Sequence, residues 1–145
     1  MSSAFDFAII TPGEIKFEGK AEIVIAPGAA GDLGALANHA PMLTTLRVGV
    51  VRANVVGASG DEASHSSRRV EFAVDGGFMQ ILPDRVLVLT DVALTESEID
   101  ADTARADLRR AEEEVAAKRG ADDASERRAA SWAQARLEVA HRSNV

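Results

Sequence analysis

The sequence contains no cysteine, which excludes disulfides, thiolate metal sites and a cysteine nucleophile. No apolar run approaches the roughly 18 residues that suggest a membrane span. The N-terminus lacks the basic region and long apolar core of a secretory signal. Basic charge is also scarce, because the formal net charge is −7, and this argues against a nucleic-acid binder. We therefore expect a cytosolic protein that contacts a membrane only through its partners.

Motifs of catalysis and ligand binding are missing as well. There is no P-loop and no G-x-S-x-G elbow. The three histidines, His39, His65 and His141, are scattered and form no close metal-binding motif. The glycine-rich segment 28–34 lacks the spacing of a dinucleotide fingerprint and the lysine of a phosphate loop, so it is interpreted as a turn. The sequence predicts no catalytic residue, no metal site and no enzyme activity of the chain alone.

Glycine and proline divide the chain into two parts. All four prolines lie before residue 84, and ten of the eleven glycines lie before residue 78. From Thr95 onward only Gly120 remains, and thirteen of these 51 residues are alanine. Glycine and proline mark turns, whereas alanine favours helix. We predict a β-sandwich domain over residues 1–92 and a two-helix domain over residues 93–145.

Short apolar or alternating runs recur between turn signals in the first part. The runs cover residues 5–9, 23–25, 48–56, 70–74, 78–82 and 86–89. This spacing predicts an antiparallel sandwich or barrel. The polar segment 57–67 is predicted to be a flexible hairpin loop, with no function assigned.

Helical signals dominate the second part. Thr95 and Glu98 match a capping box, and Gly120 can end the first helix in a left-handed conformation. Asp123 could cap a second helix. Apolar residues recur at spacings of three and four, and these are Ala101, Ala104, Leu108, Ala111 and Val115, then Ala130, Ala133, Leu137 and Ala140. They predict a hairpin whose first helix has about six turns. Alanine stripes bury little area, so we expect the hairpin's position to depend on what it packs against.

One loop identifies a family. The segment 27–43, a glycine-spaced turn followed by Asn38-His39-Ala40-Pro41, resembles the signature loop of the epsilon subunit of F-type proton-translocating ATP synthases. Further matches follow in order at residues 7–12, 46–51, 75–81, 86–91, 99–100 and 110–113. The resemblance implies a sandwich of about ten antiparallel strands followed by a C-terminal α-helical hairpin.

The resemblance also implies a place in the rotating central stalk. Such a subunit binds the gamma subunit, sits on the ring of c subunits and couples proton flow to ATP synthesis. It lies peripherally at the cytoplasmic face of the bacterial plasma membrane, which it meets only through the complex. By position, Gly31, Asp32, His39 and Pro41 are expected to face the c ring. His39 could equally be a structural residue that bonds loop carbonyls.

In this family the hairpin can extend towards the alpha and beta subunits of the catalytic head and inhibit ATP hydrolysis. Candidate contacts with acidic segments there are Arg109, Arg110, Arg127, Arg128 and Arg136. Such charges would give register and encounter rate more than affinity. The alternative for each arginine is a solvated helix surface, where intrahelical pairs contribute only tenths of a kcal/mol.

Some family members bind ATP through an Ile/Leu-Asp-x-x-Arg-Ala motif. The aligned segment 99–104 keeps Asp100 but has Thr103 where the arginine stands. Threonine is uncharged and cannot make the bidentate guanidinium contact. Shifting the alignment by two residues recovers Asp102 and Arg105 but loses the leading aliphatic residue. Asp100, Asp102 and Arg105 are the candidate nucleotide-binding residues, yet the motif argues against ATP binding, and no cofactor is predicted.

Two rival interpretations remain. One is a free-standing adaptor, a β-sandwich with a helical arm that serves another assembly, although such a protein has no need of the Gly-rich loop ending in His-Ala-Pro. The other is a small-molecule enzyme or nucleotide sensor, against which the missing catalytic motifs argue.

Overall fold

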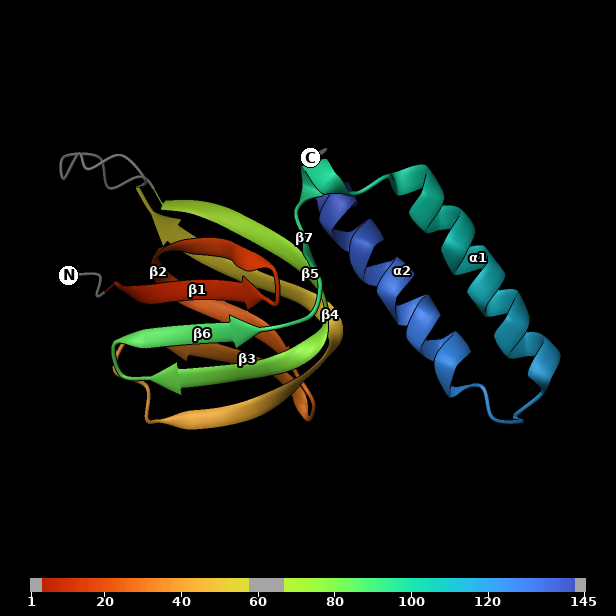
Figure 1. Ribbon diagram of the computed structural model, residues 1–145, viewed down its shortest axis with the longest axis horizontal. Helices are drawn as coiled ribbons and strands as arrows, with labels where there is room; N and C mark the ends of the chain where they lie inside the picture. Colours follow the sequence, from red (N-terminus) through yellow and green to blue (C-terminus); the bar gives the residue numbers. More distant parts are fainter. Residues whose placement is uncertain (1–3, 58–66, 143–145) are drawn as a thin grey trace.

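The computed structural model describes residues 4–57 and 67–142, and most of the predicted hairpin loop, residues 58–66, lies outside this part. A β-rich body is followed by a helical hairpin (Figure 1). The strands are β1 (Phe5–Thr11), β2 (Glu14–Gly28), β3 (Gly31–Leu36), β4 (Met42–Val56), β5 (Ser67–Leu82), β6 (Arg85–Leu89) and β7 (Ala93–Leu94). A 3-10 turn, η1 (Glu96–Glu98), leads to the helices α1 (Ala101–Lys118) and α2 (Ala124–Arg142).

The sheet closes on itself. The strand order is β1-β6-β5-β4-β2-β3, and an additional pairing between β1 and β2 completes a ring of five strands. Outside this ring, β3 pairs with β2 and β7 pairs with β5. Closure removes the open edges of β1 and β6 within the ring, whereas β3 ends the strand order outside it.

The strand count and the pairing differ from the expectation of about ten antiparallel strands. The described residues form seven strands, because β2, β4 and β5 are 15, 15 and 16 residues long and each runs through both layers. Bulges in the β2–β4 pairing let the chain bend while the ladder continues. The β1–β6 pair is parallel, because β1 closes the ring between β6 and β2.

The core lies between the two layers of the ring. Phe7, Ile9, Met79 and Ile81 are fully buried there, whereas Asp6 is exposed on the same strand as Phe7. The alternation predicted for residues 5–9 is therefore confirmed, since neighbouring side chains of a strand point to opposite faces.

The linker to the hairpin differs from the expected helix start. Thr95 and Glu98 do interact, because the Glu98 carboxylate accepts from the Thr95 backbone N–H at 3.0 Å, but they close only the 3-10 turn. Ile99 is extended and packs against a second, smaller cluster beneath α2. α1 therefore begins only after Asp100 and has 18 residues, about five turns instead of six.

The hairpin follows the predicted alanine pattern. Ala104 and Ala111 of α1 and Ala133 and Ala140 of α2 are buried. The predicted left-handed end is present at Gly120, with a φ of 86°, but α1 already ends at Arg119, its left-handed C-cap with a φ of 48°. α2 lies against the sheet and α1 lies on its far side (Figure 1). None of the helices in the described part is long and apolar enough to cross a membrane.

Candidate functional site

The loop around His39 lies at the surface and is held by its own backbone. Asn38 has a φ of 65°, and its N–H donates to Pro83 O in the β5–β6 turn at 2.7 Å. The His39 Nδ1 atom lies 2.7 Å from Ala40 O, so the ring donates to the loop. Pro41 is exposed. His39 thus bonds a loop carbonyl, and Pro41 is presented to solvent.

Gly31 and Asp32 lie at the opposite end of β3. Gly31 has a φ of 138°, and the Asp32 carboxylate accepts from Arg47 Nη2 at 2.8 Å. β3 has six residues, which at 3.3 Å per residue span roughly 20 Å. The four residues expected in one ring-facing loop therefore form two groups, one at each end of this strand.

A row of apolar side chains crosses the outer face of four strands. Ile15 of β2 pairs with Ile10 of β1, Ile10 pairs with Leu89 of β6, and Leu89 pairs with Phe78 of β5. Ile15, Phe78 and Leu89 are 58%, 49% and 41% exposed. Large apolar side chains that stay exposed and contiguous mark an interaction surface. We call these four residues the apolar row.

The surface beside the apolar row is hollowed. A pocket of about 340 Å³ is lined by Ile10, Phe78 and Leu89 together with Pro12 and Gly77. The sequence analysis did not single out this row. The alternation of β5 and β6 could have found half of it, because Met79 and Val88 fill the core and so turn Phe78 and Leu89 outward.

The docked hairpin covers a different part of the sheet. Ala73 of β5 packs with Ala135 and Val139 of α2 in a small buried cluster, which Val50 and Trp132 join at its edge. The fully buried members of this contact are alanine and valine, and the larger Leu94, Ile99 and Trp132 are partly buried against them.

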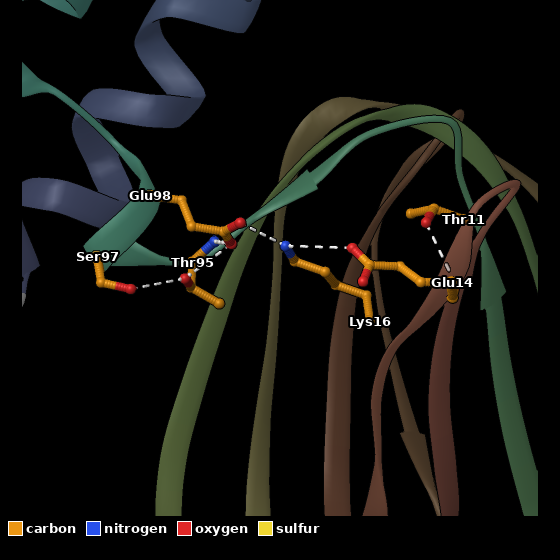
Figure 2. A network of polar contacts seen from close by, with 6 residues as sticks. All are labelled: Thr11, Glu14, Lys16, Thr95, Ser97 and Glu98. Atoms are coloured by element: carbon orange, nitrogen blue, oxygen red, sulfur yellow. Dashed lines mark hydrogen bonds and ion pairs between the residues drawn. The ribbon is translucent and has the colours of Figure 1, made fainter.

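Ion pairs join the hairpin and its linker to the sandwich, among them those of Arg128 and Lys16. Arg128 Nη2 of α2 donates to the Asp75 backbone O at 3.0 Å and to its carboxylate at 2.8 Å. Lys16 Nζ of β2 donates to Glu98 of η1 at 2.6 Å (Figure 2). The same Glu98 carboxylate accepts from the Thr95 hydroxyl at 2.9 Å, and Glu14 lies 3.9 Å from Lys16. Glu98 therefore ties the linker to β2.

These bonds lower the pKa of Glu98 to about 2, mainly through the Lys16 hydrogen bond and then the Thr95 backbone N–H. Because this folded-state pKa lies below the unfolded value of 4.5, the contact stabilises the fold above pH 4.5. The stabilisation is lost as the pH falls from there towards 2. The linker should therefore loosen in acid.

We expect Glu98→Gln to lower the melting temperature at pH 7 by about 2 °C, equivalent to about 0.5 kcal/mol. The value is kept small because the Glu98 side chain is 39% exposed and solvent screens the pair. Glu96→Gln, in the same turn, is the matched control and should change little. Melting curves from pH 7 to pH 3 should converge for the native chain and Glu98→Gln; curves that stay parallel would contradict this assignment.

The five candidate arginines have different surroundings. Arg136 donates to Asp107 of α1 at 3.0 Å and lies over the Trp132 ring, and its side chain is only 14% exposed, so it joins the two helices to each other. Arg127 pairs locally with Asp123 at 2.9 Å. Arg109 and Arg110 are exposed on α1. Arg128 is engaged by the sandwich.

The candidate nucleotide-binding residues serve the start of α1. Asp100 is its N-cap and accepts from the backbone N–H groups of Asp102 and Thr103, of which the Thr103 bond chiefly lowers the Asp100 pKa. Asp102 forms an ion pair with Arg105. All three candidate side chains are exposed, and their contacts here are those of a capped helix end.

Comparison with known proteins gives matches over most of the chain. Residues 4–96 match the family described as "ATP synthase, Delta/Epsilon chain, beta-sandwich domain". The ATP synthase epsilon chain of Desulforamulus reducens is 36% identical over 110 residues, 76% of each chain. That of Paramagnetospirillum magneticum is 36% identical over 124 residues, 86% of this chain and 82% of the relative.

Solved structures share the fold. A chain in the mitochondrial ATP synthase of Euglena gracilis (OSCP, F1 and c-ring) superposes with a TM-score of 0.70 at 18% identity, covering 98% of this chain and 82% of that one. A chain in the central stalk and c-ring of the Tetrahymena thermophila enzyme gives 0.53 at 14% identity, with 99% and 98% covered.

Proposed function

The chain belongs to the family of ATP synthase epsilon chains, and we propose that it is the non-catalytic rotor subunit of a bacterial F-type enzyme. In this role it couples proton flow through the membrane ring to ATP synthesis and restrains ATP hydrolysis through its helices. The apolar row carries the proposal. Because the apolar row is exposed on a sheet that is already closed, it is best explained as a surface that binds another protein.

The gamma subunit is the partner that we assign to the apolar row. The exposed Phe78, Leu89 and Ile15 offer the large side chains that dominate binding energy at interfaces. The pocket beside them can accept a side chain from the other protein. The apolar contact of α2 lies elsewhere on the sheet, although Asp75, which bonds Arg128 of α2, also lines this pocket.

The ring of c subunits is the second partner. Asp32 at one end of β3 and Pro41 at the other are exposed, and the two turns that carry them are candidates for this contact. The solved structures of similar fold come from assemblies that include a c-ring. The chain would then lie peripherally at the cytoplasmic face of the plasma membrane, held there by the complex.

The hairpin supplies regulation in this proposal. The fully buried part of its contact with the sandwich is a small cluster of alanine and valine beside an exposed ion pair, which supports reversible release towards the alpha and beta subunits. Arg109, Arg110 and Arg127 are accessible for acidic partners. Thr103 in place of the motif's arginine supports regulation without ATP as a cofactor of this chain. We assign residues 1–92 to docking and residues 93–145 to regulation, noting that β7 still pairs with the sandwich.

A deletion beginning at Ile99 tests the proposal, because it keeps β7 and η1 and removes both helices. We expect the reconstituted complex with the shortened chain to hydrolyse ATP several-fold faster than the complex with the full chain, while still retaining the gamma subunit on purification. A second variant, Arg136→Ala, loosens the helix pair without removing it. The rate of ATP hydrolysis of its complex should fall between those of the other two complexes. An unchanged rate of ATP hydrolysis would contradict the regulatory role. Failure of the gamma subunit to co-purify with the full-length chain would contradict the rotor role.

A further inference from the structure

The edge of β5 that faces β7 is paired over only part of its length. β7 pairs with residues 73–74, and the Asp75 N–H donates to Val92 O at 3.2 Å. Because residues two apart on a strand direct their N–H and C=O groups to the same side, Arg69 presents its backbone to the same edge as Asp75. Among the described residues, only β4 pairs with β5 over residues 67–71. We call the free side of this segment, roughly 17 Å at about 3.4 Å per residue, the open edge.

The linker to the hairpin turns away before it reaches the open edge. Thr95 is extended and follows the last residue of β7, and η1 comes directly after it. Lys16 of β2 holds Glu98 of this turn at 2.6 Å, which fixes the direction in which the chain leaves (Figure 2). The ladder that β7 begins on β5 is therefore not continued by the chain's own linker.

A hollow of about 540 Å³ lies along the open edge. Its apolar lining includes Phe17, Val70 and Phe72, and Val139 of α2 adds to it. Phe17 packs edge-on against Phe72, with ring centroids 5.7 Å apart. Arg68 also lines the hollow and lies on the same face of β5 as Val70, since side chains two residues apart share a face. An extended segment on the open edge would thus place one side chain over the apolar lining and another beside Arg68.

Arg68 sets the charge of the segment that fits. Its side chain is exposed, and within the described ranges it makes no ion pair. The two other cations of the hollow are occupied, because Arg69 pairs with Glu71 at 3.1 Å and Lys16 is held by Glu98. Opposite charges on neighbouring strands stabilise their pairing, whereas like charges destabilise it. The segment should therefore carry an acidic residue opposite Arg68.

We propose that the open edge binds an extended segment of another protein as an added strand, with an apolar side chain in the hollow and an acidic one beside Arg68. Strand addition of this kind takes affinity from main-chain hydrogen bonds and specificity from pockets for alternate side chains. The added strand runs antiparallel to β5 and continues the ladder of β7. The open edge is separate from the apolar row, so the inference goes beyond the proposed function and does not depend on it.

A synthetic pentapeptide, acetyl-Thr-Val-Thr-Glu-Thr-amide, is the probe. Aligned antiparallel to residues 71 to 67, it places valine opposite Val70 and glutamate opposite Arg68. Titration into the isotope-labelled full chain, followed by NMR, should give saturable shifts and slower hydrogen exchange at the Arg69 N–H. The amides of residues 78–82, on the part of β5 that β6 covers, are the internal reference and should not change.

N-methylated peptides test whether the probe binds as a strand. Methylation of the second threonine, whose N–H would face Arg69, should weaken binding about tenfold, because a hydrogen bond of the added strand is lost. Methylation of the valine, whose N–H would point away from β5, is the matched control and should leave the affinity nearly unchanged. Equal losses from the two methyl groups, or no binding of the unmodified peptide at millimolar concentration, would overturn the proposal.

Arg68→Glu tests the charge of the site on an exposed position that does not support the core. Its affinity for the glutamate peptide should fall roughly five-fold, and a peptide with lysine in place of glutamate should bind it better than it binds the native chain. Arg85→Glu makes the same charge change on β6 and should leave both affinities as they are. Concentration-dependent shifts of the same amides without peptide would assign the open edge to a second copy of this chain and overturn the proposal.

Discussion

Replacing Phe78 and Leu89 together by aspartate should weaken binding of the gamma subunit at least about 100-fold while the chain stays folded. Both side chains belong to the apolar row, where they are register partners on β5 and β6. An interface formed there would bury two carboxylates against apolar surface, which is unfavourable unless each finds a partner. Their outward direction protects the core, because Met79 and Val88 fill it from the same strands.

The measurement is the affinity of the purified chain for gamma, by titration calorimetry or by co-purification at graded concentrations. Leu36→Asp is the matched control, since Leu36 is equally apolar and exposed but lies on β3, outside the apolar row. It should bind gamma with native affinity. Unfolding curves verify that the double variant is folded. Native affinity in a folded double variant would show that gamma docks elsewhere.

Gly77→Ala should reduce the free energy of unfolding by at least about 3 kcal/mol and lower the melting temperature by roughly 10 °C. Gly77 has a φ of 122°, a region that residues with a Cβ rarely adopt. A Cβ built there would lie 2.1 Å from Leu89 O and 3.0 Å from Thr90 Cα. Both contacts are with backbone, so β6 would have to move away from β5 to admit the methyl group.

Gly34→Ala is the control for this variant. A Cβ at Gly34 meets nothing within 4 Å, so the substitution should change stability by a few tenths of a kcal/mol at most. Denaturant unfolding of the two variants beside the native chain gives the comparison. Equal denaturation midpoints for Gly77→Ala and the native chain would contradict this prediction, because they would show that β6 can move away from β5 without loss of stability.

The segment around Gly77 shows how local and tertiary information divide. In the sequence, residues 75–81 served only as a match to the family, and the structure places Gly76 and Gly77 inside β5 with positive φ values. The sequence could not show that this segment presents Asp75 to α2 and Phe78 to the apolar row. Those directions depend on where β4, β6 and α2 lie, which no local pattern contains.

Pattern alone determined the elements that depend on neighbours in the chain. Alternation over residues 5–9 predicted which side chains of β1 are buried, and alanine spacing predicted the buried positions Ala104, Ala111, Ala133 and Ala140. The predicted capping box is present at Thr95 and Glu98, but Ile99 packs against the cluster under α2, and the helix begins only after Asp100. Tertiary packing overrode a correct local signal there.

The β-rich first part, the helical hairpin and the family could be predicted from the sequence, because alternation, helical spacing and loop motifs act within a few residues. The parallel pairing of β1 with β6, the apolar row and the surroundings of the five candidate arginines depend on the tertiary structure. Ile10, Phe78 and Leu89 become neighbours through strand register, and Arg128 meets Asp75 across 53 residues. Such contacts form between segments that are distant in the chain, so their geometry exists only once the sheet has closed and the hairpin has docked.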